Sequence, residues 1–166
     1  YADGKPAAAL MIMWEAPGAG EDRQGVPFVG ASGKLLEMML AAIGRDRGSV
    51  YISNVLFWRP PGNRTPTDAE VAVCMPFVQR HIALVRPKVL MFVGGASAKA
   101  LLDRKEGIMR LRGKWNEYQN PGLDSPVPAM ATFHPAYLLR SPGQKREAWR
   151  DFLAVQVRLA EISHQN

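Results

Sequence analysis

The stretch VLMFVGGASAKALL, from Val89 to Leu102, decides the fold class of this sequence. Its first five residues are all apolar, which is typical of a strand that is covered on both faces. Gly94 and Gly95 interrupt the run, and Ala96–Leu102 is predicted to form a short helix after them. A buried strand followed by a turn and a helix is the unit from which α/β domains are built.

Three more runs of this kind lie elsewhere in the sequence, at Ala8–Met13, Val50–Leu56 and Val127–Thr132. Pro128 weakens the last prediction, because proline is tolerated only near the start or at the edge of a strand. Helix-like segments separate the runs, so right-handed crossovers are expected to build a mostly parallel sheet with helices on both faces. We therefore expect a single domain over residues 1–166.

Three further helices are predicted, over residues 35–43, 67–84 and 144–162. Gly44 ends the first helix, and Thr67 forms a capping box with Glu70 at the start of the second. Pro76, inside the second helix, is expected to kink or break it. The apolar stripe of the third helix is predicted to comprise Trp149, Phe152, Leu153, Val157 and Ala160.

Composition and charge exclude several classes of protein. No apolar stretch is long enough to span a membrane, so no membrane partner is expected. The single cysteine, Cys74, fits the reducing cytoplasm, where we expect a monomer. The formal net charge of +6 favours an anionic partner, with nucleic acid first.

Ligands of open α/β sheets bind outside the carboxyl ends of the strands, so the segments after the predicted strands are candidate sites. The first, residues 14–33, is a long loop rich in glycine and proline, and such loops are usually functional or disordered. Within it, Glu15 is either a base in a partly desolvated pocket or a solvated carboxylate. Phe28 is either a platform on which a base stacks or a hydrophobic plug.

Asn54 ends the second predicted strand. Its amide offers one acceptor and two donors, which match the O4 and N3–H edge of uracil, although asparagine at a strand end is also a common turn former. The following segment RPPGNR, residues 59–64, is a stiff turn with two guanidinium groups. It is either a phosphate contact or a solvated loop.

The segment HPAYLLR, residues 134–140, follows the last predicted strand. His134 is either a donor that stabilises a developing anion or a structural histidine. Leu138 and Leu139, beside Arg140, are either an apolar wedge that fills the stack after a base is flipped out or ordinary core residues. The sequence has no metal-ligand cluster and no Gly-x-Ser-x-Gly nucleophile elbow, so neither a metal site nor a serine hydrolase is expected.

Together these motifs resemble the family 4 uracil-DNA glycosylases. EAPG (15–18) leading to PFVG (27–30), YISNV (51–55) leading to RPPGNR, and HPAYLLR stand in that family's order and spacing. The resemblance extends from Ala8 to about Leu159. It implies an α/β fold, a three-layer α/β/α sandwich with a central four-stranded parallel sheet. It also implies hydrolysis of the N-glycosidic bond of deoxyuridine in DNA, a step of base excision repair.

The resemblance assigns roles to the motif residues. It implies that Glu15 positions or activates the water and that His134 stabilises the departing uracil anion, so these two are the predicted catalytic residues. The predicted substrate-binding residues are Ala16, Gly18, Glu21, Phe28 and Asn54. The predicted DNA-binding residues are Arg59, Asn63, Arg64, Leu138, Leu139 and Arg140.

Family 4 members usually hold a [4Fe–4S] cluster on four cysteines. Here Trp58 stands where one cysteine would be, and only Cys74 occupies a cluster-like place. A cysteine pair upstream would still leave the set incomplete, so we predict no iron–sulfur cluster and no other cofactor, with Trp58 and its neighbours packing into the space. Trp14 replaces the small residue that commonly precedes Glu15, and it either packs in the core or reshapes the pocket floor.

Two hypotheses for function remain. The first is a monofunctional glycosylase that acts on uracil, with related deaminated bases as further candidates, in single- or double-stranded DNA. No lysine is placed for a lyase step, and residues 62–66 lack the histidine of relatives that trap DNA covalently, so turnover to an intact abasic site is expected. The alternative is a non-catalytic nucleic-acid-binding member of the same superfamily.

Overall fold

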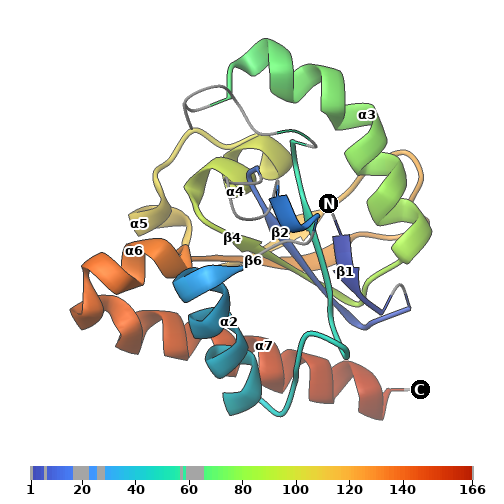
Figure 1. The fold of residues 1–166 in the computed structure, drawn as a ribbon. Coiled ribbons are helices and arrows are strands. Elements are labelled where there is room, and N and C mark those ends of the chain that lie inside the picture. Colours follow the sequence, from blue (N-terminus) through green and yellow to red (C-terminus); the bar gives the residue numbers. More distant parts are fainter. Residues whose placement is uncertain are drawn as a thin grey trace.

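The structure is a computed structural model that describes residues 2–5, 7–16, 23–25, 29–56, 58 and 66–165 (Figure 1). A sheet of six strands runs through its centre in the order β1-β3-β2-β4-β6-β5. The strands are β1 (Ala2–Gly4), β2 (Leu10–Trp14), β3 (Tyr51–Asn54), β4 (Val89–Val93), β5 (Trp115–Tyr118) and β6 (Val127–Thr132).

The four inner strands β3, β2, β4 and β6 are parallel to one another. They are the four apolar runs of the sequence, so the predicted α/β class with a parallel central sheet is confirmed. β1 and β5 add antiparallel edges beside β3 and β6, and the sequence did not predict either of them. The reason is that β1 reads Ala-Asp-Gly and β5 reads Trp-Asn-Glu-Tyr, so neither contains a continuous apolar run.

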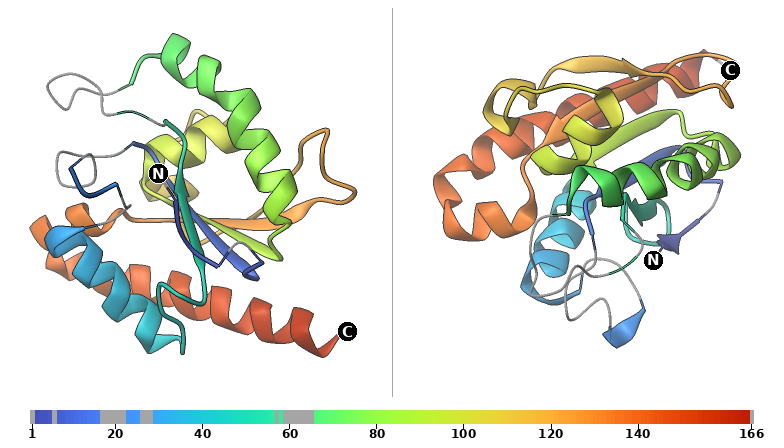
Figure 2. Two further views of the ribbon diagram at one scale, coloured as in Figure 1. Left: turned by 45° about the vertical axis from the view of Figure 1, so that its right-hand side comes forward. Right: turned by 90° about the horizontal axis from the view of Figure 1, so that it is seen from above.

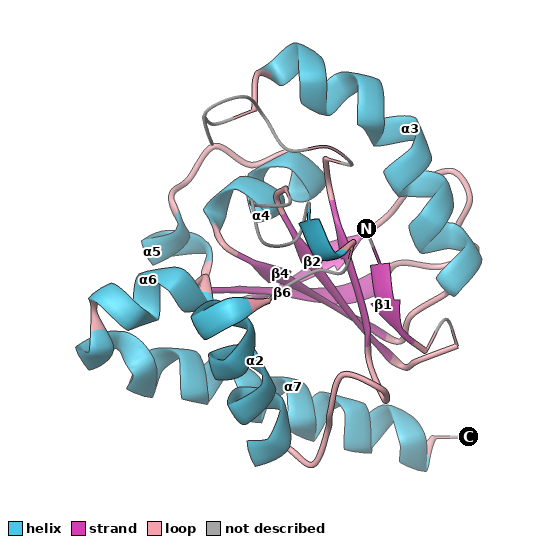
Figure 3. Ribbon diagram, in the orientation of Figure 1, coloured by secondary structure: helices cyan, strands magenta, loops and turns pink. Residues whose placement is uncertain are grey.

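Helices cover both faces of the sheet, as Figure 2 shows from two further sides and Figure 3 by secondary structure. They are α2 (Gly30–Ala42), α3 (Asp68–Val85), α4 (Gly95–Leu102), α5 (Ile108–Leu111), α6 (Pro135–Arg140) and α7 (Lys145–His164), with a 3-10 turn η2 (Pro142–Gln144) before α7. On one face α2 and α7 pack against strand residues such as Ile12 and Met91, and on the other α3 and α4 pack against Met11 and Phe92. The molecule is therefore the expected three-layer sandwich.

Helix α3 begins as the sequence predicts. Thr67 is its N-cap: the Thr67 Oγ1 accepts from the Glu70 N–H at 3.1 Å, and the Glu70 Oε1 accepts from the Thr67 N–H at 2.9 Å. The helix then continues through Pro76, so a break there is wrong. Pro76 and Ala72, whose carbonyl the proline leaves unpaired, are both exposed, so water can satisfy that carbonyl.

Helix α7 buries a face that only partly matches the predicted stripe: Phe152 is buried and Leu153 packs against the core, as predicted. Its buried residues are Ala148, Asp151, Phe152, Val155 and Leu159. Trp149 and Val157, which the predicted stripe includes, are 38% and 56% exposed. The prediction fails because it excludes a charged residue, Asp151, from the buried face. None of the helices in the described ranges is both long and apolar enough to cross a membrane.

The connections after β2 and β4 leave the sheet toward opposite sides. β2 leads through α2 to β3, whereas β4 leads through α4, α5 and the edge strand β5 to β6, on the other side of the β2–β4 pair. Such a switch point in a parallel sheet marks where ligands bind, outside the carboxyl ends of the two strands.

Candidate functional site

Three predicted site residues leave the sheet at the same edge. Trp14 and Asn54 are paired at the ends of β2 and β3, so Glu15 follows directly beside Asn54. β6 ends two residues before His134, on the far side of β4. The structure therefore brings Glu15, Asn54 and His134 to the carboxyl edge of the sheet, around the switch point.

Asn54 is a buried amide for which the described part of the chain shows no side-chain hydrogen bond. It is 0% exposed, and neither Oδ1 nor Nδ2 has a hydrogen-bond partner among the described residues. A turn-forming asparagine would bond the nearby backbone, so the turn interpretation does not fit this side chain. Leaving a buried polar group unpaired costs about 1–3 kcal/mol. The Asn54 amide therefore keeps an acceptor and a donor available for a ligand.

His134 bonds the α6 backbone through one ring nitrogen. It is the N-cap of α6, and its Nδ1 accepts a hydrogen bond from the Ala136 N–H at 3.0 Å. Burial, together with the nearby Arg140, lowers the pKa of His134 to about 4, so the ring is neutral near pH 7. A neutral ring whose Nδ1 accepts carries its proton on Nε2. His134 therefore carries a neutral ring with its proton on Nε2 at this edge of the sheet.

Trp14 and Gly94 shape the space around His134. The ring centroids of Trp14 and His134 lie 6.5 Å apart, and Trp14 is 4% exposed within the core. Trp14 thus packs in the core, as one of its two interpretations expects, and also lies beside the histidine. Gly94 has a φ of +96°, and a Cβ on it would lie 3.5 Å from the His134 Cβ. The sequence marks Gly94 only as a turn, and its positive φ, which favours glycine, is what this turn beside His134 requires.

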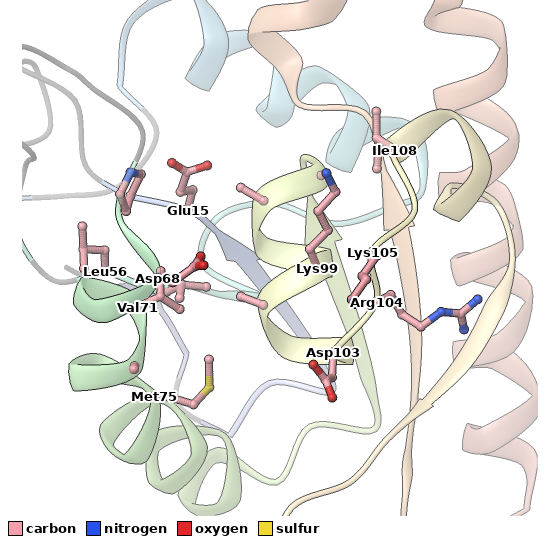
Figure 4. Close-up of a pocket in the computed structure, with 16 residues that line it drawn as sticks. Glu15, Leu56, Asp68, Val71, Met75, Lys99, Asp103, Arg104, Lys105 and Ile108 are labelled. Carbon is pink, nitrogen blue, oxygen red and sulfur yellow. The ribbon is translucent and has the colours of Figure 1, made fainter.

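Glu15 lines a cavity of about 830 Å³ between α3 and α4. The apolar part of the cavity wall includes Val55, Leu56 and Met75. Figure 4 shows Lys99 reaching up from α4 across from Glu15. Burial raises the pKa of Glu15, so this carboxylate is partly desolvated, in line with the first of its two interpretations. The described lining includes neither Asn54 nor His134, so the cavity adjoins the site on the Glu15 side.

The two leucines of α6 lie in different environments. Leu138 is 0% exposed and packs with Phe133 and Ala148, whereas Leu139 is 44% exposed and lies next to the exposed Arg140. Successive residues of a helix point in different directions, so both leucines cannot serve as a surface wedge. The prediction that Leu138 contacts DNA is therefore wrong, because this residue belongs to the core.

Several predicted residues lie outside the described residues. They are Gly18, Glu21, Phe28, Arg59, Asn63 and Arg64. Ala16 is described and packs against the core on the α3 and α4 side. Trp58 is 39% exposed and does not join a buried cluster of the described residues, so the expectation that its ring packs into the space of a cluster is wrong.

The side chains of this chain do not fit a [4Fe–4S] cluster. Such a cluster is held by four cysteine thiolates, and the sequence contains one cysteine, Cys74. Cys74 is 2% exposed and packs in the core beneath α3. In the part of the chain that the structure describes, no group of three or more His, Cys, Asp or Glu side chains is arranged to hold a metal ion.

Comparison with known proteins places this geometry in a family. Residues 1–153 match the family model described as the uracil DNA glycosylase superfamily. A type-4 uracil-DNA glycosylase of Pyrobaculum aerophilum is 40% identical over 153 residues, which cover 90% of this chain and 77% of that protein. Similar proteins of the same name occur in Archaeoglobus fulgidus, with 40% identity over 90% of this chain and 76% of the relative, and in Thermotoga maritima, with 39% identity over 84% and 70%.

Proposed function

This chain belongs to the uracil-DNA glycosylase superfamily, and we propose that it is a monofunctional glycosylase that releases uracil from DNA and leaves an intact abasic site. The observation that carries the proposal is the unpaired, buried amide of Asn54 at the same edge as the neutral donor of His134 and the half-buried Glu15. These groups supply base recognition, leaving-group stabilisation and a carboxylate for the attacking water.

Asn54 recognises the base in this proposal. Its Nδ2 donates to uracil O4 and its Oδ1 accepts from uracil N3–H, so both unpaired atoms become bonded when uracil enters. A site built to bond such groups rejects a base that lacks them by about 10⁴-fold, because its own buried atoms then stay unpaired. Thymine presents the same edge as uracil, so its exclusion has to come from the space around C5.

His134 stabilises the leaving group. When the C1′–N1 bond breaks, its electron pair stays on uracil, and negative charge develops on the carbonyl oxygens of the base. The Nε2–H of the neutral ring donates to one of these oxygens, and that hydrogen bond strengthens as the charge grows. A donor of this kind contributes about 10²–10³ in rate.

Glu15 acts on the sugar side of the bond. The water oxygen bonds to C1′ as uracil leaves, and the Glu15 carboxylate accepts the proton of that water. Its negative charge also stabilises the oxocarbenium-like sugar. Because burial raises its pKa, Glu15 is a better proton acceptor than a fully solvated carboxylate.

Lys99 is the lysine to consider for a lyase step beyond the abasic site. The sequence predicts no lysine at the site, but Lys99 lines the cavity beside Glu15. Its side chain is exposed, and it lacks the desolvation that activates lysine nucleophiles. We therefore retain the monofunctional reaction. Borohydride reduction during turnover tests it, since a covalent DNA adduct that Lys99→Ala abolishes would show lyase chemistry instead.

The exposed end of α6 supplies contact with DNA. Leu139 fills the stack from which the uracil has been flipped, and Arg140 contacts a phosphate. Arg59 and Arg64 are proposed phosphate contacts on the sequence motif alone. A cationic surface of this kind makes DNA binding weaken as the salt concentration rises.

The test of function uses single- and double-stranded oligonucleotides that carry one uracil. We expect strand cleavage at the uracil position only after treatment with alkali, in at least one strand form. Absence of alkali-labile sites in both would contradict the proposal, and salt-dependent binding without base release would identify a binding protein instead. Matched oligonucleotides with hypoxanthine or xanthine measure whether other deaminated bases are substrates.

We also propose that this chain works without an iron–sulfur cluster, since its single cysteine is buried in the core. The measurement is the iron content of protein purified without oxygen, alongside its uracil release. Active protein with negligible iron is expected, whereas iron at the level of one cluster per chain would overturn this part of the proposal.

A further inference from the structure

A buried ion pair is hydrogen-bonded to Thr132, two residues before His134 in the sequence. Asp151, on α7, is 1% exposed. Its Oδ1 accepts from the Arg112 Nη2 at 2.5 Å, and its Oδ2 accepts from the Arg112 Nε at 3.1 Å and from the Thr132 Oγ1 at 2.8 Å. These three hydrogen bonds compensate for burying the carboxylate. The proposed chemistry does not use Asp151, so its presence needs another reason.

The end of β6 is held from several directions, by the ion pair and by the turn after β4. Thr132 is the last residue of β6, and its backbone oxygen accepts from the Gly94 N–H at 2.9 Å. The Arg112 Cζ lies 5.8 Å from the centre of the Phe133 ring. The two residues before His134 are thus held by α7, by the segment after α5 and by the turn after β4.

Stability alone does not explain why this ion pair is kept. Replacing a buried ion pair by well-packed apolar side chains is often neutral or stabilising. The ion pair fixes the orientation of the groups it joins, because its hydrogen bonds set the angles as well as the distances between them. A donor that stabilises a transition state has to be held within about 0.5 Å of its productive position. His134 is such a donor, and its backbone follows directly from Thr132 and Phe133.

We propose that Asp151 is a positioning residue for His134. By joining Thr132 to Arg112, it fixes the segment Thr132–His134 so that the His134 Nε2–H is held toward the leaving group. The proposal rests on the proposed function, because the leaving group is what His134 stabilises. Asp151 itself touches neither DNA nor the reacting atoms, and it acts only through its two partners.

Thr132 provides a matched pair of variants for the test. Thr132→Ser keeps the hydroxyl that donates to Asp151, whereas Thr132→Val keeps the shape and removes the hydroxyl. We expect Thr132→Ser to release uracil at nearly the wild-type single-turnover rate. Thr132→Val and Asp151→Asn are expected to lower that rate by about 10- to 10²-fold, with DNA affinity unchanged. Asp3→Asn, which weakens the Asp3–Arg47 pair at the opposite edge of the sheet, is the control and should keep the wild-type rate.

The ¹⁵N signals of the His134 ring give a second measurement, on the free protein. The wild type should show one tautomer with the proton on Nε2, and Thr132→Val and Asp151→Asn should show a mixture of ring environments. Unchanged ring signals and an unchanged rate per folded molecule, with only a lower melting temperature, would overturn the proposal. If Asp151→Asn is unfolded at the assay temperature, Thr132→Val is compared with Thr132→Ser instead. The single-turnover rate and the His134 ring signals of these two variants then test the proposal.

The same measurements separate this proposal from the proposed function. A wild-type protein that releases no uracil would contradict the function, and the ring signals would still show whether Asp151 positions His134. An active wild type whose Thr132→Val variant keeps the wild-type rate and ring signals would contradict the positioning role alone.

Discussion

Two polar side chains are buried at the carboxyl edge of the sheet, and they differ in whether their surroundings supply hydrogen-bond partners. Asp151, beside the end of β6, carries a carboxylate, and both of its oxygens accept hydrogen bonds. Asn54, at the end of β3, is uncharged, and neither atom of its amide is bonded among the described residues. The group that is harder to bury is the one that the fold satisfies.

This difference distinguishes a side chain that supports the structure, Asp151, from one that is proposed to recognise a ligand, Asn54. A buried group that is fully bonded stabilises the native state and fixes geometry, whereas one left unpaired destabilises the native state and becomes satisfied when a ligand binds. Mutations at the two positions are therefore expected to change stability in opposite directions.

Asp151→Ala should cause the largest loss of stability. Removing Asp151 leaves the Arg112 guanidinium with only the weaker contact to Glu147, at 3.6 Å, and the free energy of unfolding should fall by about 3 kcal/mol. Urea denaturation measures it. Glu106→Ala removes the exposed pair between Arg104 and Glu106 and should leave the midpoint close to wild type. Equal losses in the two variants would remove the distinction between buried and surface pairs.

His134→Ala should lower the single-turnover rate of uracil release by about 10²–10³, because the donor to the leaving group is lost. DNA affinity should stay near that of the wild type. The substitution also removes the α6 N-cap. His134→Asn keeps a capping side chain and should show the same loss of rate, measured on the same oligonucleotide. A wild-type rate in both variants would exclude His134 from the reaction.

The lowered pKa of His134 predicts how stability depends on pH. The unfolded histidine binds a proton near pH 6.5, whereas the folded one does so only near pH 4. The unfolded state therefore binds more protons in this window, and folding loses about 3 kcal/mol as the pH falls through it. Urea denaturation at pH 7 and near pH 4 measures the loss, which should be smaller in His134→Asn. An equal loss in both proteins would mean that His134 is not the titrating group.

Leu139→Ala should have the smallest effect. The wedge compensates for unstacking the flipped base, so uracil release from double-stranded DNA should slow by roughly 10-fold or less, and release from single strands should hardly change. Leu138→Ala is the matched variant, because Leu138 is buried and should lower the melting temperature instead. A strand-dependent loss of rate in Leu138→Ala instead of Leu139→Ala would contradict the role of Leu139 as the wedge.

Local sequence patterns predict much of this structure because they depend on neighbouring residues. The four parallel strands follow from four apolar runs, and the capping box follows from Thr67 and Glu70. Glu15, Asn54 and His134 are predicted for the same reason, since each lies at or directly after the end of a predicted strand. That the Asn54 side chain has no hydrogen-bond partner within the described ranges is not predictable, because it depends on every atom that surrounds the amide in the fold.

Asp151 shows where sequence patterns fail. A charged residue in a helix is expected to face solvent, and its partners Arg112 and Thr132 lie 39 and 19 residues away along the chain. One signal was present in the sequence. The residues Ala148, Phe152, Val155 and Leu159 form an apolar stripe at helical spacing, and Asp151 lies within it. A charged residue inside such a stripe indicates a buried charge with a partner elsewhere in the chain.

The most direct test of the contrast is Asn54→Leu, with melting temperature and uracil release measured on the same preparation. Leucine has a similar shape and needs no hydrogen bond, so the melting temperature should equal or exceed that of the wild type. Uracil release should slow by about 10⁴-fold, because the base loses both of its bonding partners. A variant that is less stable than the wild type and still releases uracil at the wild-type rate would contradict the conclusion that Asn54 is held unpaired to recognise uracil.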